Sequence, residues 1–483
     1  MKRTSLLVRA RFTVTALVGA WALFSHPAAR AYESATTHAG LTERAVEASR
    51  LHNVLAQLGR PLGLLEPLRI GFDFFDQDER RALQARLDAL DPAGGYRPGP
   101  DGVAGAAHWV VAGAVLAKTP PERGANHFLD PASGKGLHDG PGLSGIAHSL
   151  RLLFNGGASV RELAAGTAFT LEGKSALDWI WTPGNDLGVP VFLDSWEHAV
   201  SLAEPRARES ALVRALLALG GVMAVLEDAG QPAFVRNDFR GAFLQQDDGS
   251  AYEQFVAAHY GRTGLPAAGA SVSRPDIASF FASADGKGLA NRTQRRFFSE
   301  GTIPADVSIE RDTKVADVVR RARESLVFPS PTLSALVLRP AQTRHYLALE
   351  GHRVLAYENS GTQVRFLLDD AVYADMARTL LPEIASYAAG LLNHLLRAHL
   401  EMTIAGTSVN VRLGGEVKQG GALRVFVEDA SGRRRELPGA VASLSPGGEI
   451  TVNPPAGARK LAAVVRGRDV GGPFVAAGEV TLP

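Results

Sequence analysis

The sequence contains no cysteine. Without thiols the chain can form neither disulfide bonds nor a zinc site built on cysteine ligands. It also lacks an excess of charge, since 51 Lys and Arg residues stand against 50 Asp and Glu residues. A net charge of +1 gives no overall basic footprint for nucleic acid, so such binding would need a local patch. With 46% hydrophobic residues, the composition is not that of a disordered chain.

The first 31 residues have the pattern of a secretory signal peptide. Basic residues at the start are followed by an apolar stretch from Phe12 to Phe24 and by the A-x-A sequence Ala29-Arg30-Ala31. The apolar stretch is shorter than the roughly 20 residues that a membrane span needs, which disfavours the alternative of an uncleaved anchor. We therefore expect cleavage before Tyr32, secretion or periplasmic export, and no later stretch apolar enough to span a membrane.

Residues 32–400 have a mostly helical pattern. Apolar residues from Leu41 to Leu58 recur every three or four positions, as on one face of a helix, and Gly59 and Pro61 follow. The clearest helix is expected from Pro205 to Gly230. Another is expected from Asp375 to Leu400, interrupted near Pro382.

The pattern changes between His399 and Thr407. Five short apolar runs follow, separated by Gly and Pro, and we expect them to be strands: 409–413, 423–427, 450–452, 461–465 and 475–482. The sequence thus predicts a mainly α protein with a helical domain over 32–400 and a small β-sandwich over 401–483.

Three segments carry polar residues suited to chemistry. They are Thr37–Glu43 with His38, Asn126–Pro131 with His127, and Leu219–Phe234 with Asp228. In this order and spacing they resemble the zinc-dependent phospholipase C family and the single-strand-specific nucleases that share its all-helical fold. The resemblance implies a cleft among helices in which three zinc ions activate water toward a phosphodiester.

The resemblance assigns residual metal ligands to four side chains: His38, His127, Asp228 and Glu253. Asp228 is also the remaining candidate for a catalytic residue. The expected cleft is lined by Lys118, Ala224, Phe234, Arg236 and Asn237.

Several ligand positions of the resembled family are occupied by residues that cannot bind zinc. Ala224 and Phe234 stand where the family has histidine, and Gly249 stands four residues before Glu253. Ala117 and Lys118 align with a Glu-Asp pair, and Tyr32 with the N-terminal tryptophan.

Zinc needs three or four nitrogen, oxygen or sulfur ligands, so these replacements predict the loss of at least one site. An ammonium about 4 Å from a divalent zinc is repelled by roughly 8 kcal/mol at an effective dielectric constant near 20. Lys118 would then replace the charge of the metal, and we expect an ion pair between Lys118 and Asp228.

Each of these residues also has an ordinary interpretation. His127 could be a loop histidine that caps backbone groups, and His38 an exposed residue at a helix start. Asp228 lies near a helix C-terminus, where the dipole disfavours an acid, so a lysine or arginine partner is favoured over a metal. Glu253 has the position of a solvated helix glutamate.

Three functions follow from these patterns. The first is a catalytically degenerate secreted protein that binds a phosphate-bearing ligand, such as a phospholipid headgroup, or another protein, with fewer zinc ions or none. The second is an active phosphodiester hydrolase, acting on phospholipid or nucleic acid, with an altered zinc site. The third is an adhesive or structural protein that acts through its β-domain.

Overall fold

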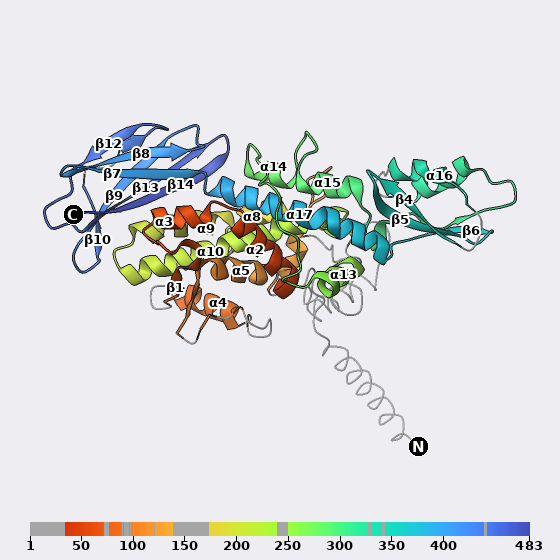
Figure 1. Cartoon of the computed structure of the whole chain (residues 1–483), viewed down its shortest axis with the longest axis horizontal. Helices are drawn as coiled ribbons and strands as arrows, with labels where there is room; N and C mark the ends of the chain where they lie inside the picture. Colours follow the sequence, from red (N-terminus) through yellow and green to blue (C-terminus); the bar gives the residue numbers. More distant parts are fainter. Residues whose placement is uncertain are drawn as a thin grey trace, which may run out of the picture.

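The computed structural model describes residues 34–71, 77–88, 90, 96, 98–99, 101–119, 121–138, 173–238, 250–326, 331–339, 343–438 and 442–483. The molecule is elongated, with a β-sandwich at one end, a helical body in the middle and a small sheet with α16 (Val315–Glu324) at the other end (Figure 1). The signal-peptide prediction, Tyr32 and Gly249 lie outside the described residues.

The helical body is formed by segments that precede the small sheet in the sequence and by α17, which follows it. Its elements are η1 (Ser34–His38), α2 (Ala39–Glu47), α3 (Leu51–Gln57), η2 (Gly63–Leu65), β1 (Pro67–Arg69), α4 (Gln77–Asp88), β2 (Val103–Gly105), α5 (Ala106–Leu116), η4 (Pro121–His127), α8 (Ala176–Trp181), α9 (Val189–Ser201), α10 (Pro205–Asp228), α11 (Pro232–Val235), α13 (Ala251–Tyr260), α14 (Ile277–Phe281), α15 (Leu289–Arg296), η5 (Glu300–Thr302) and α17 (Asp370–Leu395).

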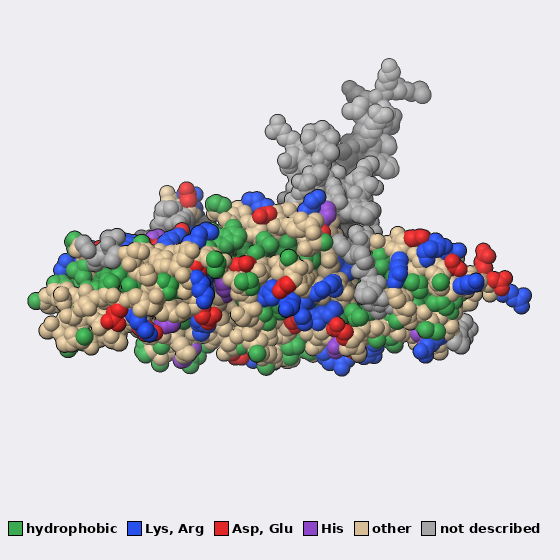
Figure 2. All heavy atoms as spheres, turned by 90° about the horizontal axis from the view of Figure 1, so that it is seen from above, with side chains coloured by type: hydrophobic (Ala, Val, Ile, Leu, Met, Phe, Trp, Pro, Cys, Tyr) green, Lys and Arg blue, Asp and Glu red, His purple; other side chains and the backbone are tan. Residues whose placement is uncertain are grey.

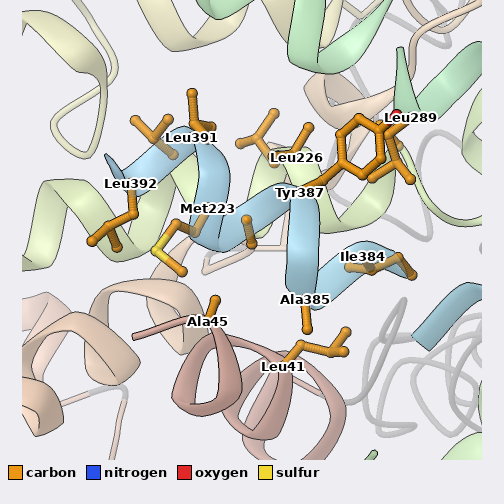
Figure 3. Close-up of a cluster of buried hydrophobic side chains, with 14 of the residues drawn as sticks. Leu41, Ala45, Met223, Leu226, Leu289, Ile384, Ala385, Tyr387, Leu391 and Leu392 are labelled. Atoms are coloured by element: carbon orange, nitrogen blue, oxygen red, sulfur yellow. The ribbon is translucent and has the colours of Figure 1, made fainter. Parts of the chain in front are cut away.

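Helix α10 is the centre of this body. From Ala215 to Asp228 every one of its residues is buried, and it packs against α5, α9 and α17. Figure 3 shows Met223 and Leu226 of α10 beside Leu391 and Leu392 of α17. Leu41 of α2 also reaches α17 there, so three segments far apart in the sequence share one core.

Small residues allow α5 and α10 to touch along their backbones. A Cβ added at Gly220 would lie 1.8 Å from the carbonyl oxygen of Val110, and one at Gly113 would lie 2.0 Å from that of Leu217. One turn after Gly220, Ala224 packs with two alanines at the end of α5. This close approach brings the C-terminal ends of the two helices together.

A four-stranded antiparallel sheet lies within the segment for which the sequence predicted helices. Its strand order is β3-β6-β5-β4, and α16 (Val315–Glu324) and η6 (Pro331–Ala335) accompany it. The strands are β3 (Val307–Ser308), β4 (Arg344–Leu349), β5 (His352–Asn359) and β6 (Gln363–Leu367). Their alternating pattern is confined to short, charge-rich stretches, which explains why the helical interpretation missed them.

The C-terminal region is a two-sheet sandwich, as the sequence predicted. One sheet has the order β12-β8-β7, and the other has the order β10-β9-β13-β14 with β11 also paired to β9. The strands are β7 (Ala398–Ala405), β8 (Ser408–Gly415), β9 (Gly421–Glu428), β10 (Arg434–Glu436), β11 (Ala442–Leu444), β12 (Glu449–Val452), β13 (Lys460–Asp469) and β14 (Gly472–Thr481). The helical region followed by a C-terminal β-domain is therefore confirmed.

The larger sheet of the sandwich is buried on both faces. Along β13, Leu461, Ala463 and Val465 belong to the core between the two sheets. The intervening Ala462 and Val464 belong to the core of the helical body, as the alternation of side chains along a strand requires. This outer face packs on α9, so the sandwich is docked on the helices through an apolar interface.

The individual helices differ from the sequence predictions in three ways. The pattern from Leu41 to Leu58 forms two helices, α2 and α3, with a break between them. Helix α17 starts at Asp370 and runs through Pro382 without the expected interruption. By composition, α10 is the one described helix that is long and apolar enough to cross a membrane, contrary to expectation, but 89% of its most apolar window is buried.

Candidate functional site: a buried ion cluster

The carboxylate of Asp228 is surrounded by nitrogen atoms. Asp228 is the last residue of α10 and is fully buried. Its Oδ1 accepts hydrogen bonds from Lys118 Nζ and Gln231 Nε2, both at 2.8 Å, and lies 3.2 Å from His38 Nε2. Its Oδ2 lies 2.7 Å from His127 Nδ1. The Lys118–Asp228 ion pair expected from the sequence is therefore present.

A second carboxylate completes the cluster. Glu227, next to Asp228 in the helix, is 0% exposed. One of its oxygens lies 2.6 Å from His38 Nδ1, and the other accepts a hydrogen bond of 2.8 Å from the hydroxyl of Thr42. The imidazole of His38 thus lies between two acids, with one ring nitrogen toward each.

Lys118, Phe234 and Ala224, which stand where the resembled family has metal ligands, pack closely with their neighbours. Lys118 follows the end of α5, and its ammonium lies 4.7 Å from the centre of the Phe234 ring. That ring also packs against Phe128, with ring centres 4.4 Å apart. Ala224 packs between Ala114 and Ala117, where its small side chain admits the close contact of α5 with α10.

Each carboxylate of the cluster has a basic partner from the protein itself. Burial alone would raise the pKa of Asp228, but the charges of Lys118 and then His38 hold it far below its usual value. Burial alone would lower the pKa of His38, but the nearby charge of Asp228 raises it, while burial raises the pKa of Glu227. His38 and Glu227 thus form one buried acid–base pair, and Lys118 and Asp228 form the other.

His127 is the neutral member of the cluster. Burial is the largest influence and lowers its pKa from 6.5 to about 4, although the hydrogen bond to Asp228 opposes this shift. An ionised carboxylate accepts hydrogen bonds, so Nδ1 of the neutral ring carries the proton. Nε2 then has a lone pair, and it is buried with no hydrogen-bond partner among the residues that the structure describes.

The donor set does not fit the zinc ions that the resemblance implies. The lone pair of His127 Nε2 would suit a metal, because ligating histidines commonly donate their other N–H to a carboxylate. A zinc ion nevertheless needs three or four such donors. Within the described ranges, no group of three or more His, Asp or Glu side chains could hold a metal ion. The ammonium of Lys118, 2.8 Å from Asp228 Oδ1, already supplies the positive charge beside this carboxylate.

Three other predicted site residues have bonds elsewhere. Glu253 is 1% exposed, and its carboxylate accepts the N–H of Ser250 at 2.6 Å in a capping box at the start of α13. Arg236 is buried and donates to the hydroxyl of Thr302 and to backbone carbonyls. Asn237, at a φ of 51°, forms two hydrogen bonds with the backbone of His138.

These positions decide between the ordinary interpretations. His38 is 0% exposed, so it is not a solvated helix-start residue, and Glu253 is not a solvated helix glutamate. Asp228 has the lysine partner that its place at a helix C-terminus called for. Lys118, Ala224 and Phe234 lie together at the cluster but are buried, so their role as the lining of a cleft stays a prediction.

Sequence reasoning missed Glu227, Thr42 and Gln231. All three lie within the quoted motifs, and spacing is a signal that could have found two of them, Thr42 and Gln231. Thr42 is four residues after His38, and Gln231 is three residues after Asp228, so each lies within a helical turn of a selected residue.

We expect Lys118→Met to lower the free energy of unfolding by about 3 to 5 kcal/mol, because it leaves a buried carboxylate without its counter-ion. Urea denaturation at neutral pH measures this change. The matched control is Lys135→Met, which removes an exposed lysine and should change stability by less than about 0.5 kcal/mol. Adding Asp228→Asn to the Lys118 variant should recover part of the loss. Equal stability of Lys118→Met and its control Lys135→Met would contradict the proposed pairing of Lys118 with Asp228.

We also expect His127 to make stability depend on acidity. Its pKa of about 4 lies below the 6.5 of an unperturbed histidine, so between these values the unfolded chain binds a proton that the folded chain does not. The free energy of unfolding is therefore unaffected by the titration of His127 above about pH 6.5, and this titration lowers it by about 3 kcal/mol as the pH approaches 4.

The measurement is urea denaturation of wild type and of His127→Gln at pH 7.5 and pH 5. We expect the wild type to lose more stability on acidification than this variant. His198→Gln, which replaces an exposed imidazole, should follow the wild type. Parallel pH dependences of wild type and His127→Gln would show that His127 is not held neutral.

Comparison with known proteins gives distant structural similarity. No protein-family model matches the chain, and no curated protein matches it significantly. The alpha toxin from Clostridium absonum aligns over 94% of this chain and 96% of its own, with 10% identity and a TM-score of 0.25. The Clostridium perfringens alpha-toxin from avian strain SWCP aligns over 94% and 100%, with 11% identity and a TM-score of 0.25. Scores this low do not assign the family, so the resemblance seen in the motifs stays a prediction.

Proposed function

We propose that the protein is a secreted, non-hydrolytic relative of the phospholipase-C-like proteins, which acts by binding. The observation that carries the proposal is the position of Lys118. Its ammonium lies 2.8 Å from Asp228, the carboxylate that the resemblance assigns to the metal centre, and its side chain is 7% exposed. A fixed positive charge there takes over the electrostatic role of the metal without its chemistry.

Phosphodiester hydrolysis needs an activated water and access for the substrate. An ammonium supplies no open coordination position at which water could ionise. Asp228 has no exposed surface, and its hydrogen bonds to Lys118, Gln231 and His127 occupy both oxygens. A carboxylate held in this way is a poor general base, because its pKa is kept low and no substrate atom can reach it.

We favour binding by the whole protein over the alternative in which the β-domain acts independently. One face of the larger sheet is buried on the helical body, with Val464, Phe426 and Val475 in the helical core. A sandwich acting alone would expose these side chains to water. The proposed ligand is a phosphate-bearing compound, as the motif resemblance implies, bound by the docked protein as a whole.

Hydrolysis assays test the proposal. Full-length mature protein is incubated with zinc and one of three phosphodiesters: bis(p-nitrophenyl) phosphate, phosphatidylcholine vesicles or single-stranded DNA. We expect no product above the enzyme-free blank, while an active zinc phospholipase C in the same buffer releases product from the vesicles. Zinc-dependent product that disappears in a folded Asp228→Asn variant would overturn the proposal.

A further inference from the structure

A pocket lies at the junction of the helical body and the β-sandwich, away from the Asp228 cluster. It encloses about 270 Å³ between the start of α10, the end of α3, the end of α9 and strands β9, β10, β13 and β14. Its wall contains five basic and three acidic side chains, so two positive charges are in excess. The basic residues are Arg60, Arg206, Arg208, Arg434 and Lys460, and the acidic ones are Glu209, Glu428 and Glu479.

Three of the basic residues are fixed by the acids of the sandwich. Glu428 accepts hydrogen bonds of 2.9 Å from Arg208 Nη2 and from Arg434 Nε. Glu479 pairs with Arg434 and, at 2.6 Å, with Lys460. Two carboxylates therefore hold three cations, so this part of the pocket wall carries a net positive charge.

The third acid is committed to another element. Glu209 accepts the backbone N–H of Arg69 at 2.9 Å. This hydrogen bond holds the Glu209 carboxylate toward β1, and its negative charge is already included in the excess of two positive charges.

Arg60 and Arg206 supply the charge that is not paired. Among the described residues, neither side chain forms a hydrogen bond or an ion pair, although Arg60 is half-buried. Burial, and then the charge of Arg434, lower the pKa of Arg208 to about 10, with Arg60 adding to this effect. The wall thus holds more positive charge than its own acids offset, which an anion in the pocket would relieve.

The backbone adds to the same field. Helix α10 begins at Pro205 on the pocket wall, and its N-cap residue Glu204 makes no side-chain cap. The first N–H groups of a helix and the positive end of its dipole attract anions. Guanidinium groups match the oxygens of a phosphate in geometry as well as charge.

We propose that this pocket is a binding site for a phosphate dianion, contacted by Arg60 and Arg206. Two negative charges match the excess of two on the wall, and the volume admits a phosphate with a small substituent. The same group could arrive as a soluble phosphate monoester or as the headgroup of a lipid. The site is distinct from the Asp228 cluster, so it stands whether or not that cluster hydrolyses phosphodiesters.

Calorimetric titration of the mature protein with inorganic phosphate and with glycerol 3-phosphate tests the site. We expect one saturable site per chain for glycerol 3-phosphate, weakened roughly tenfold or more by Arg60→Gln and by Arg206→Gln. Neither side chain has a hydrogen bond or ion pair to the described part of the chain, so both variants should unfold at the wild-type temperature. Arg311→Gln removes an exposed arginine elsewhere and should leave the affinity unchanged.

Sedimentation with vesicles distinguishes the two sources of phosphate. Binding to phosphatidic acid vesicles that is lost in the Arg60→Gln/Arg206→Gln double variant would support the site and assign it to a lipid headgroup. The proposal is overturned if neither the soluble phosphates nor the vesicles bind. It is equally overturned if the double variant binds them as the Arg311 variant does.

Discussion

A carboxylate buried at the negative end of a long helix has to be neutralised, and the centre of the helical body is organised around that requirement. Asp228 ends the 24-residue helix α10 with no exposed surface. Both the loss of hydration and the helix dipole oppose a charge there. Lys118, His127 and Gln231 supply the compensating hydrogen bonds. Lys118 can reach Asp228 because small residues let α5 lie directly against α10.

A buried carboxylate with basic partners also links the helical body to the β-sandwich. Arg208 on α10 and Arg434 on β10 share the carboxylate of Glu428 at the buried junction. Basic residues outnumber acidic residues in the wall of the pocket at this junction. Figure 2 shows Lys and Arg side chains gathered near the middle of one face, where α15 lies in Figure 1. There Arg292 and Arg296 both contact Glu383.

Much of the architecture could be predicted from the sequence. The continuous apolar stretch after Pro205 predicted α10, and the short apolar runs after residue 407 predicted five strands of the sandwich. The sheet from Val307 to Leu367 was missed because its strands carry alternating charged residues that do not stand out locally. Pro382 predicts a break, yet α17 continues through it, because the residues before and after it are buried in the core.

The candidate site was predictable in part. The motif alignment places Lys118 at a position where the resembled family has an acidic residue. A lysine there predicts an ion pair with the remaining carboxylate of Asp228, and the structure contains this pair. Glu227 was missed because an acid beside Asp228 at a helix end has the pattern of a solvated pair. Its burial follows from the place of α2, whose Thr42 and the preceding His38 cover it. That contact between distant segments is not visible in local spacing.

The zinc content of the mature protein, purified with zinc in the buffer and then freed of loose metal, tests most directly whether an ion pair has replaced the metal. We predict no stoichiometric zinc in wild type, because Lys118 neutralises Asp228 and, among the described residues, no group of three or more His, Asp or Glu side chains could hold a metal ion. Two or three zinc ions per chain would contradict this conclusion.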